Sequence, residues 1–170
     1  MINQTTENRI NKKRVLPAVM LLCSLCFLCG CTANPKNFSL SGLTITLTDD
    51  FEVGKANAFD IYIKSEDVIF TAVEETTSEL EYAGYEISSL SDYADEIIKL
   101  NSASSSSLQT RNDYKYFVTN KTVSGASYTY VHCIFKYADA YWVCEFACKT
   151  KNYDKLDDKI LNWADTIKFD

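Results

Sequence analysis

The chain has 170 residues, 17 basic and 23 acidic side chains, and a formal net charge of −6 at pH 7. Nucleic acid and anionic lipid surfaces both reward clustered lysine and arginine, so this charge argues against either of them as a partner. The length is that of one ordinary domain with a core of its own, and no internal repeat suggests a second.

The first part of the chain, residues 1–30, has the pattern of an export signal. The basic cluster Lys12-Lys13-Arg14 precedes an apolar run at 15–29 that ends in small residues. That run has 15 residues and contains Pro17, whereas a membrane-spanning helix needs roughly 20 residues. Removal of the signal would take away four basic side chains and one acidic side chain, which would leave the mature chain still more acidic.

The end of the run, Leu28-Cys29-Gly30-Cys31, resembles the bacterial lipoprotein box, with an aliphatic residue at −3 and glycine at −1. The resemblance implies that Cys31 carries the lipid, such as palmitate, and becomes the mature N-terminus. It also implies a lipidated tether at 31–37 and a location on the extracytoplasmic face of a bacterial cell membrane. An uncleaved membrane anchor and cleavage without a lipid are the two alternatives.

Strands outnumber helices in the remainder, 38–170, which we expect to form a single domain. Period-2 alternation of apolar and β-branched residues predicts strands at 38–47, 114–119, 128–137 and 141–150, and a hairpin at 59–73. In that hairpin a turn at Ser65-Glu66 would pair Ile63 with Val68, because only an odd register keeps both apolar faces on one side.

Two helices are predicted from apolar stripes. One spans 92–101, with Ser91 as its cap and Tyr93, Ala94, Ile97 and Leu100 facing inward. The other spans 153–167, with Leu156, Ile160, Trp163, Ala164 and Ile167 on one stripe. Thr76 with Glu79, or Ser78 with Glu81, could also cap a brief helical turn near Leu80. Together these elements indicate an α+β fold, a mainly antiparallel sheet flanked by helices.

The opening strand at 42–51, with its polar turn and Phe51, resembles the start of PsbP-like domains. The close resembles them too: an aromatic hairpin, then a helix ending in Trp163-Ala164-Asp165-Thr166-Ile167-Lys168-Phe169. The resemblance covers most of 38–169 and implies an αβα sandwich. Known members of this family, which include a Ran-binding nuclear-transport factor, act as adaptors or assembly subunits. The family contributes no catalytic motif that could be assigned to residues here.

His132 is the only histidine, so Ser–His or Cys–His catalysis would have to use it. In one register of the late hairpin it lies opposite Glu145, which is an ordinary cross-strand contact. The acids Glu74, Glu75, Glu79 and Glu81 lack the spacing of a calcium loop and are expected to be solvated. No metal, cofactor or catalytic residue is therefore predicted.

The cysteines left in the mature domain are Cys133, Cys144 and Cys148. For the apolar faces of the late hairpin to coincide, the numbers of any two directly opposed residues must add up to an odd value, and the turn allows either 277 or 279. The first sum, which we prefer, opposes Cys133 to Cys144, and the second opposes Cys133 to Phe146. In the first register Cys133 and Cys144 could either form a disulfide or remain two buried thiols. Cys148 stays free in each case.

A cluster of tyrosines in the late strands could form a binding surface or belong to the core: Tyr114, Tyr116, Tyr128, Tyr130 and Tyr141. The leading hypothesis is a non-enzymatic, lipid-anchored binding or assembly module with an unknown protein partner. The alternatives are a hydrolase-type enzyme that uses His132 and a structural envelope lipoprotein without a fixed ligand.

Overall fold

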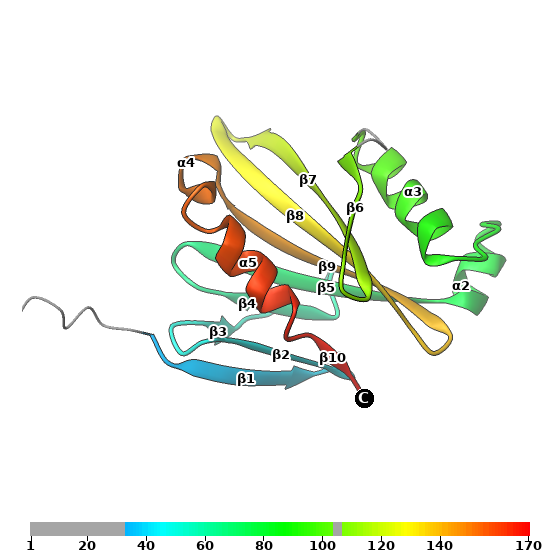
Figure 1. Ribbon diagram of the computed structural model, residues 1–170, viewed down its shortest axis with the longest axis horizontal. Helices are drawn as coiled ribbons and strands as arrows, with labels where there is room; N and C mark the ends of the chain where they lie inside the picture. The colour runs from blue at the N-terminus through cyan, green and yellow to red at the C-terminus, as the bar shows by residue number, and fades with distance from the viewer. Residues whose placement is uncertain (1–32, 104–106) are drawn as a thin grey trace, which may run out of the picture. The chain divides into compact units, whose positions relative to one another are not determined.

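A seven-stranded antiparallel sheet occupies the middle of the domain (Figure 1). The computed structural model describes residues 33–103 and 107–170, so the expected signal peptide and Cys31 lie outside the described residues. The strands follow the order β3-β4-β5-β9-β8-β7-β6. Their bounds are β3 Glu52–Val53, β4 Ile61–Lys64, β5 Val68–Thr76, β6 Gln109–Arg111, β7 Tyr114–Val123, β8 Ala126–Tyr137 and β9 Ala140–Lys149.

A second, three-stranded sheet joins the beginning of the domain to its end. It has the order β1-β2-β10, with bounds β1 Pro35–Leu40, β2 Leu43–Thr48 and β10 Lys168–Phe169. The single strand predicted at 38–47 is wrong, because the chain reverses at Ser41-Gly42, where φ is 47° and 79°. Two positive φ angles make the tight turn that suits a hairpin, and glycine adopts one without strain. β1 also begins at Pro35, within the segment expected to be a tether.

Helices lie on both faces of the large sheet, which confirms the expected α+β class. The helices are α2 Thr77–Tyr82, α3 Leu90–Leu100, α4 Thr150–Tyr153 and α5 Asp157–Ala164. One core joins α5 and the small sheet to the β5, β8 and β9 side chains that include Phe70, Cys133 and Phe146. A second core joins α2 and α3 to Phe117, Ile134 and Tyr141 on the opposite face. The second sheet beside α5 was not predicted.

The register of the late hairpin is confirmed as the one whose residue numbers sum to 277. Cys133 lies opposite Cys144, and His132 lies opposite Glu145. The earlier hairpin was predicted two residues out of register, since Ile63 pairs with Phe70 and not with Val68. Its turn is at 66–67, because the Ser65 N–H donates to the Val68 carbonyl and the Ser65 hydroxyl accepts from the Val68 N–H.

The helix termini differ from the sequence prediction. α3 begins two residues earlier, with Ser89 as its cap in a reciprocal capping box with Asp92, and Leu100 is exposed rather than inward. The long helix expected at 153–167 is shorter at both ends, because α4 ends at Tyr153 and α5 spans only Asp157–Ala164. The chain leaves α5 where the Thr166 hydroxyl donates to the Trp163 carbonyl and accepts from the Thr46 N–H. Within 33–103 and 107–170, no helix combines the length and the apolar character needed to cross a membrane.

Candidate functional site

The only histidine is held inside the sheet by its strand neighbours. His132 is 1% exposed, and its Nδ1 lies 2.9 Å from Glu145 Oε2. On the other side of the ring, Nε2 lies 2.9 Å from the Thr119 hydroxyl oxygen. The imidazole stacks on the Phe117 ring, with the two centroids 4.5 Å apart. Both ring nitrogens therefore lie against a polar partner within the domain.

The order Thr119, His132, Glu145 has the sequence of polar contacts of a nucleophile, a base and an orienting acid. The first position, however, holds a threonine hydroxyl and not the serine or cysteine that the hydrolase hypothesis requires. A substrate would also have to reach an imidazole that is almost wholly buried. A satisfied polar contact across neighbouring strands explains the same geometry.

The five tyrosines proposed as a binding surface do not lie together. Tyr116 pairs with Cys133, so Tyr114 and Tyr116 lie on the face of the sheet that α5 covers. The other three lie on the opposite face, where α3 packs on Tyr141. Tyr114 and Tyr141 are each 1% exposed, so neither can offer a surface to a partner. Sequence reasoning grouped them because it did not fix the register between β7 and β8.

The three cysteines of the domain are buried thiols in the structure. Cys133 and Cys144 oppose one another on neighbouring strands and are both fully buried. Burial raises the pKa of the Cys133, Cys144 and Cys148 thiols. Because the thiolate is the reactive form, all three should resist alkylation while the domain is folded.

We expect N-ethylmaleimide to modify none of Cys133, Cys144 and Cys148 in the native protein and all three after denaturation. Peptide mapping by mass spectrometry after alkylation under the two conditions measures this residue by residue. Recovery of Cys133 and Cys144 in one cross-linked peptide pair, which separates into two peptides on reduction, would contradict the prediction and show a disulfide instead.

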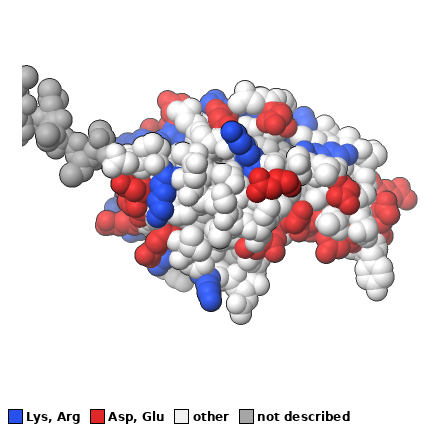
Figure 2. Space-filling view, turned by 90° about the horizontal axis from the view of Figure 1, so that it is seen from below, with Lys and Arg blue, Asp and Glu red and all other residues white. Residues whose placement is uncertain are grey.

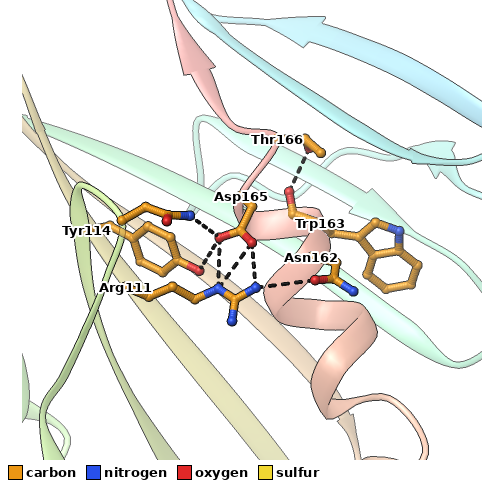
Figure 3. A network of polar contacts seen from close by, with 7 residues as sticks. Arg111, Tyr114, Asn162, Trp163, Asp165 and Thr166 are labelled. Carbon is orange, nitrogen blue, oxygen red and sulfur yellow. Dashed lines mark hydrogen bonds and ion pairs between the residues drawn. The ribbon is translucent and has the colours of Figure 1, made fainter.

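A polar network around Asp165, which sequence analysis did not detect, ties the β6–β7 hairpin to the end of α5 (Figure 3). The Arg111 guanidinium donates to both Asp165 oxygens, with an Nη2–Oδ2 distance of 2.5 Å and an Nε–Oδ1 distance of 2.9 Å. The Tyr114 hydroxyl and the Asn112 amide donate to Oδ1 of the same carboxylate. These donors, with Arg111 first, hold the pKa of Asp165 below its usual range.

We interpret this network as structural. Arg111 and Asp165 already satisfy one another, and an Arg–carboxylate pair with two parallel hydrogen bonds is a strong, directional contact. The two residues lie 54 positions apart, so no local pattern in the sequence could have paired them.

A small hollow between α2 and α3 combines apolar and acidic side chains. It measures about 40 Å³ and is lined by Glu75, Leu80, Tyr85, Ile87, Tyr93, Glu96, Ile97 and Leu100; we call it the α2–α3 hollow. A wider, open depression of about 550 Å³ adjoins it through Tyr85 and Ile87 and carries Glu81 and Glu86. Figure 2 shows acidic side chains gathered at the end of the molecule that carries α2.

Hydrogen bonds fix the walls of the α2–α3 hollow. The Tyr93 hydroxyl donates to the Glu75 carboxylate, and the Tyr93 ring stacks on Tyr141 at a centroid distance of 4.6 Å. Burial and this hydrogen bond raise the pKa of Tyr93, so the phenol stays protonated as a donor. The Glu75 carboxylate, which accepts this hydrogen bond, therefore has a fixed position at the edge of the hollow.

The end of α2 places Tyr85 over the hollow. The Tyr85 N–H donates to the Leu80 carbonyl, and the Gly84 N–H donates to the Glu81 carbonyl. With φ of 85° at Gly84, this is a Schellman motif. In this motif the residue after the glycine, here Tyr85, packs near the residue three positions before the C-cap, here Leu80. Tyr85 and Leu80 accordingly line the same hollow.

The four acids considered as a cation site are separated by the fold. Glu75 lines the α2–α3 hollow, whereas Glu74 lines a separate surface hollow together with Asp139 and Asp170. Glu79 forms the capping box of α2 with Thr76. In the described part of the chain, no group of three or more histidine, cysteine or acidic residues is placed to hold a metal ion.

No protein-family model matches the chain, and no curated protein does. A crystal structure from Bacteroides thetaiotaomicron VPI-5482 is similar at a TM-score of 0.55 and 14% identity, over 79% of this chain and 48% of that chain. The chain thus spans about half the length of that protein. At this identity the likeness shows a shared fold and nothing about activity.

Two further solved structures are similar at lower TM-scores. The solution structure of cyanobacterial PsbP (CyanoP) from Synechocystis sp. PCC 6803 matches at 0.49 and 10% identity, over 84% of this chain and 97% of that chain. LpqN of Mycobacterium tuberculosis, described as involved in cell envelope biogenesis, matches at 0.40 and 12% identity, over 82% and 86%.

Proposed function

We propose that the protein is an extracytoplasmic lipoprotein, anchored to a bacterial cell membrane through Cys31, whose domain is a non-enzymatic binding or assembly module. The observation that carries the anchor is the sequence Leu28-Cys29-Gly30-Cys31 at the end of a basic and then apolar segment. Because β1 begins at Pro35, at most about 14 Å of extended chain would separate the lipidated residue from the first strand. The anchor would therefore keep the domain close to the bilayer.

The α2–α3 hollow supports the binding part of the proposal. Two large apolar side chains of its lining stay exposed: Leu100 is 68% exposed and Tyr85 39%. Contiguous exposed apolar side chains rimmed by polar groups are typical of surfaces that contact other proteins. The hydrolase alternative has one observation in its favour, the contacts of His132 with Thr119 and Glu145, and it needs access to a buried ring.

Cys31→Ala should abolish fatty-acid labelling and either release the protein from the membrane or stop its processing. Cells fed an alkyne-tagged fatty acid, followed by precipitation of the protein and fluorescent detection of the tag, measure this. Cys29→Ala is the matched control, because alanine suits the position before glycine in a lipoprotein box and labelling should persist. Equal labelling of Cys31→Ala and the unmodified protein would exclude the lipid anchor.

A further inference from the structure

We propose that the α2–α3 hollow receives one cationic side chain, lysine or arginine, from a basic segment of a partner protein. This inference deepens the proposed binding function by naming the chemistry of the partner. It does not depend on the lipid at Cys31.

The size of the hollow suits a single side chain. Its volume of about 40 Å³ lies far below the roughly 300–1,000 Å³ of pockets that enclose small molecules. Four aliphatic side chains contribute to its lining: Leu80, Ile87, Ile97 and Leu100. The methylene stem of lysine or arginine packs on such a surface while its charged end reaches a polar rim.

The charges on the rim select a cation. Glu75 and Glu96 line the hollow, and the Tyr93 hydroxyl orients the Glu75 carboxylate. The chain already places an ammonium group at this rim, because Lys99 Nζ lies 2.6 Å from Glu96 Oε1. Lys99 is well exposed, so an incoming cation with an apolar stem can replace it at little cost.

An aromatic ring also lines the α2–α3 hollow. Tyr85 is partly exposed at the lining of the hollow, in a position set by the Schellman end of α2. A guanidinium or ammonium group over such a ring gains a cation–π attraction. Glu81 and Glu86 in the adjoining depression continue the negative charge beyond the hollow. A segment with a second basic residue would therefore match the surface better than an isolated cation.

The probe for this proposal is the fluorescein-labelled peptide Gly-Leu-Arg-Leu-Lys-Gly, compared with the same peptide carrying citrulline for arginine and norleucine for lysine. Both are titrated against the mature protein in nonionic detergent micelles, and binding is followed by fluorescence anisotropy. We expect the basic peptide to bind and the neutral peptide to bind at least about tenfold more weakly. Equal binding of the two peptides, or none by the basic one, would overturn the proposal.

The double variant Glu75→Gln/Glu96→Gln should weaken binding of the basic peptide by about tenfold, since two partly exposed ion pairs are lost. Glutamine keeps an oxygen that can accept from the Tyr93 hydroxyl, so the fold should persist, which far-UV circular dichroism checks. The control is Glu66→Gln/Asp158→Asn, which removes the same charge from two exposed acids outside the hollow. Equal weakening by both double variants would assign the effect to net charge and reject the site. Loss of the lipid anchor in the Cys31 experiment would leave these results unchanged.

Discussion

Replacing Phe146 with alanine should lower the free energy of unfolding by about 3–5 kcal/mol. Phe146 is 0% exposed on the central strand β9, where it pairs with Phe70 on one side and Val131 on the other. Its ring lies 4.9 Å from the Phe70 ring and 6.3 Å from the Trp163 ring of α5, measured between centroids. Truncation therefore opens a cavity where the sheet meets the helix layer, and neighbouring strands cannot collapse to fill it.

Urea denaturation followed by tryptophan fluorescence and circular dichroism measures this change. Val123→Ala is the control, since Val123 lies near the end of β7 and is about half exposed. Its replacement should change the free energy of unfolding by less than about 0.5 kcal/mol. A Phe146→Ala protein within about 1 kcal/mol of the unmodified chain would show that this face is not the main core.

The late hairpin could be predicted because its sequence constrains the register on both strands. Apolar residues alternate along β8 and β9, so only odd sums bring Val131, Cys133 and Phe135 onto the face of Trp142 and Cys144. The tight turn at 138–139 then selects one sum. In the earlier hairpin the prediction of an odd sum was also correct. The turn nevertheless lies one position later than predicted, because Ser65 forms hydrogen bonds with Val68.

Other features depend on contacts between distant segments. The small sheet gains its third strand only when β10, at the end of the chain, pairs with β2. The stripe of Trp163 and Ala164 predicted a helix that continued to 167, whereas α5 ends at Ala164, ahead of this strand. The α2–α3 hollow likewise joins Glu75, before α2, to Glu96, on α3. The sequence shows the acids but not their separation, in which Glu79 forms the capping box of α2 while Glu75 lines the hollow.

Replacing Asp165 with asparagine should lower the free energy of unfolding at pH 7 by about 1–2 kcal/mol, because the network loses the carboxylate charge and one of its two acceptor oxygens at a partly exposed position. Arg111 would keep its charge at a half-buried position without a carboxylate, and the buried Tyr114 hydroxyl would lose a charged acceptor. Asp158→Asn is the matched control on the same helix, where the side chain is exposed and only its favourable place in the first turn is lost, so the change should stay below about 1 kcal/mol.

The effect of Asp165→Asn should also depend on pH, which distinguishes loss of the carboxylate charge from a packing defect. The folded protein holds the pKa of Asp165 below that of an ordinary aspartate, chiefly through the Arg111 hydrogen bonds. The carboxylate thus stabilises the fold above its unfolded-state pKa of about 4, and this stabilisation is lost as the pH falls through the lower folded value. Urea midpoints at pH 7, 4 and 2.5 should therefore show the gap between the two proteins narrowing below pH 4. A gap that stays constant down to pH 2.5 would contradict the role assigned to the ionised carboxylate.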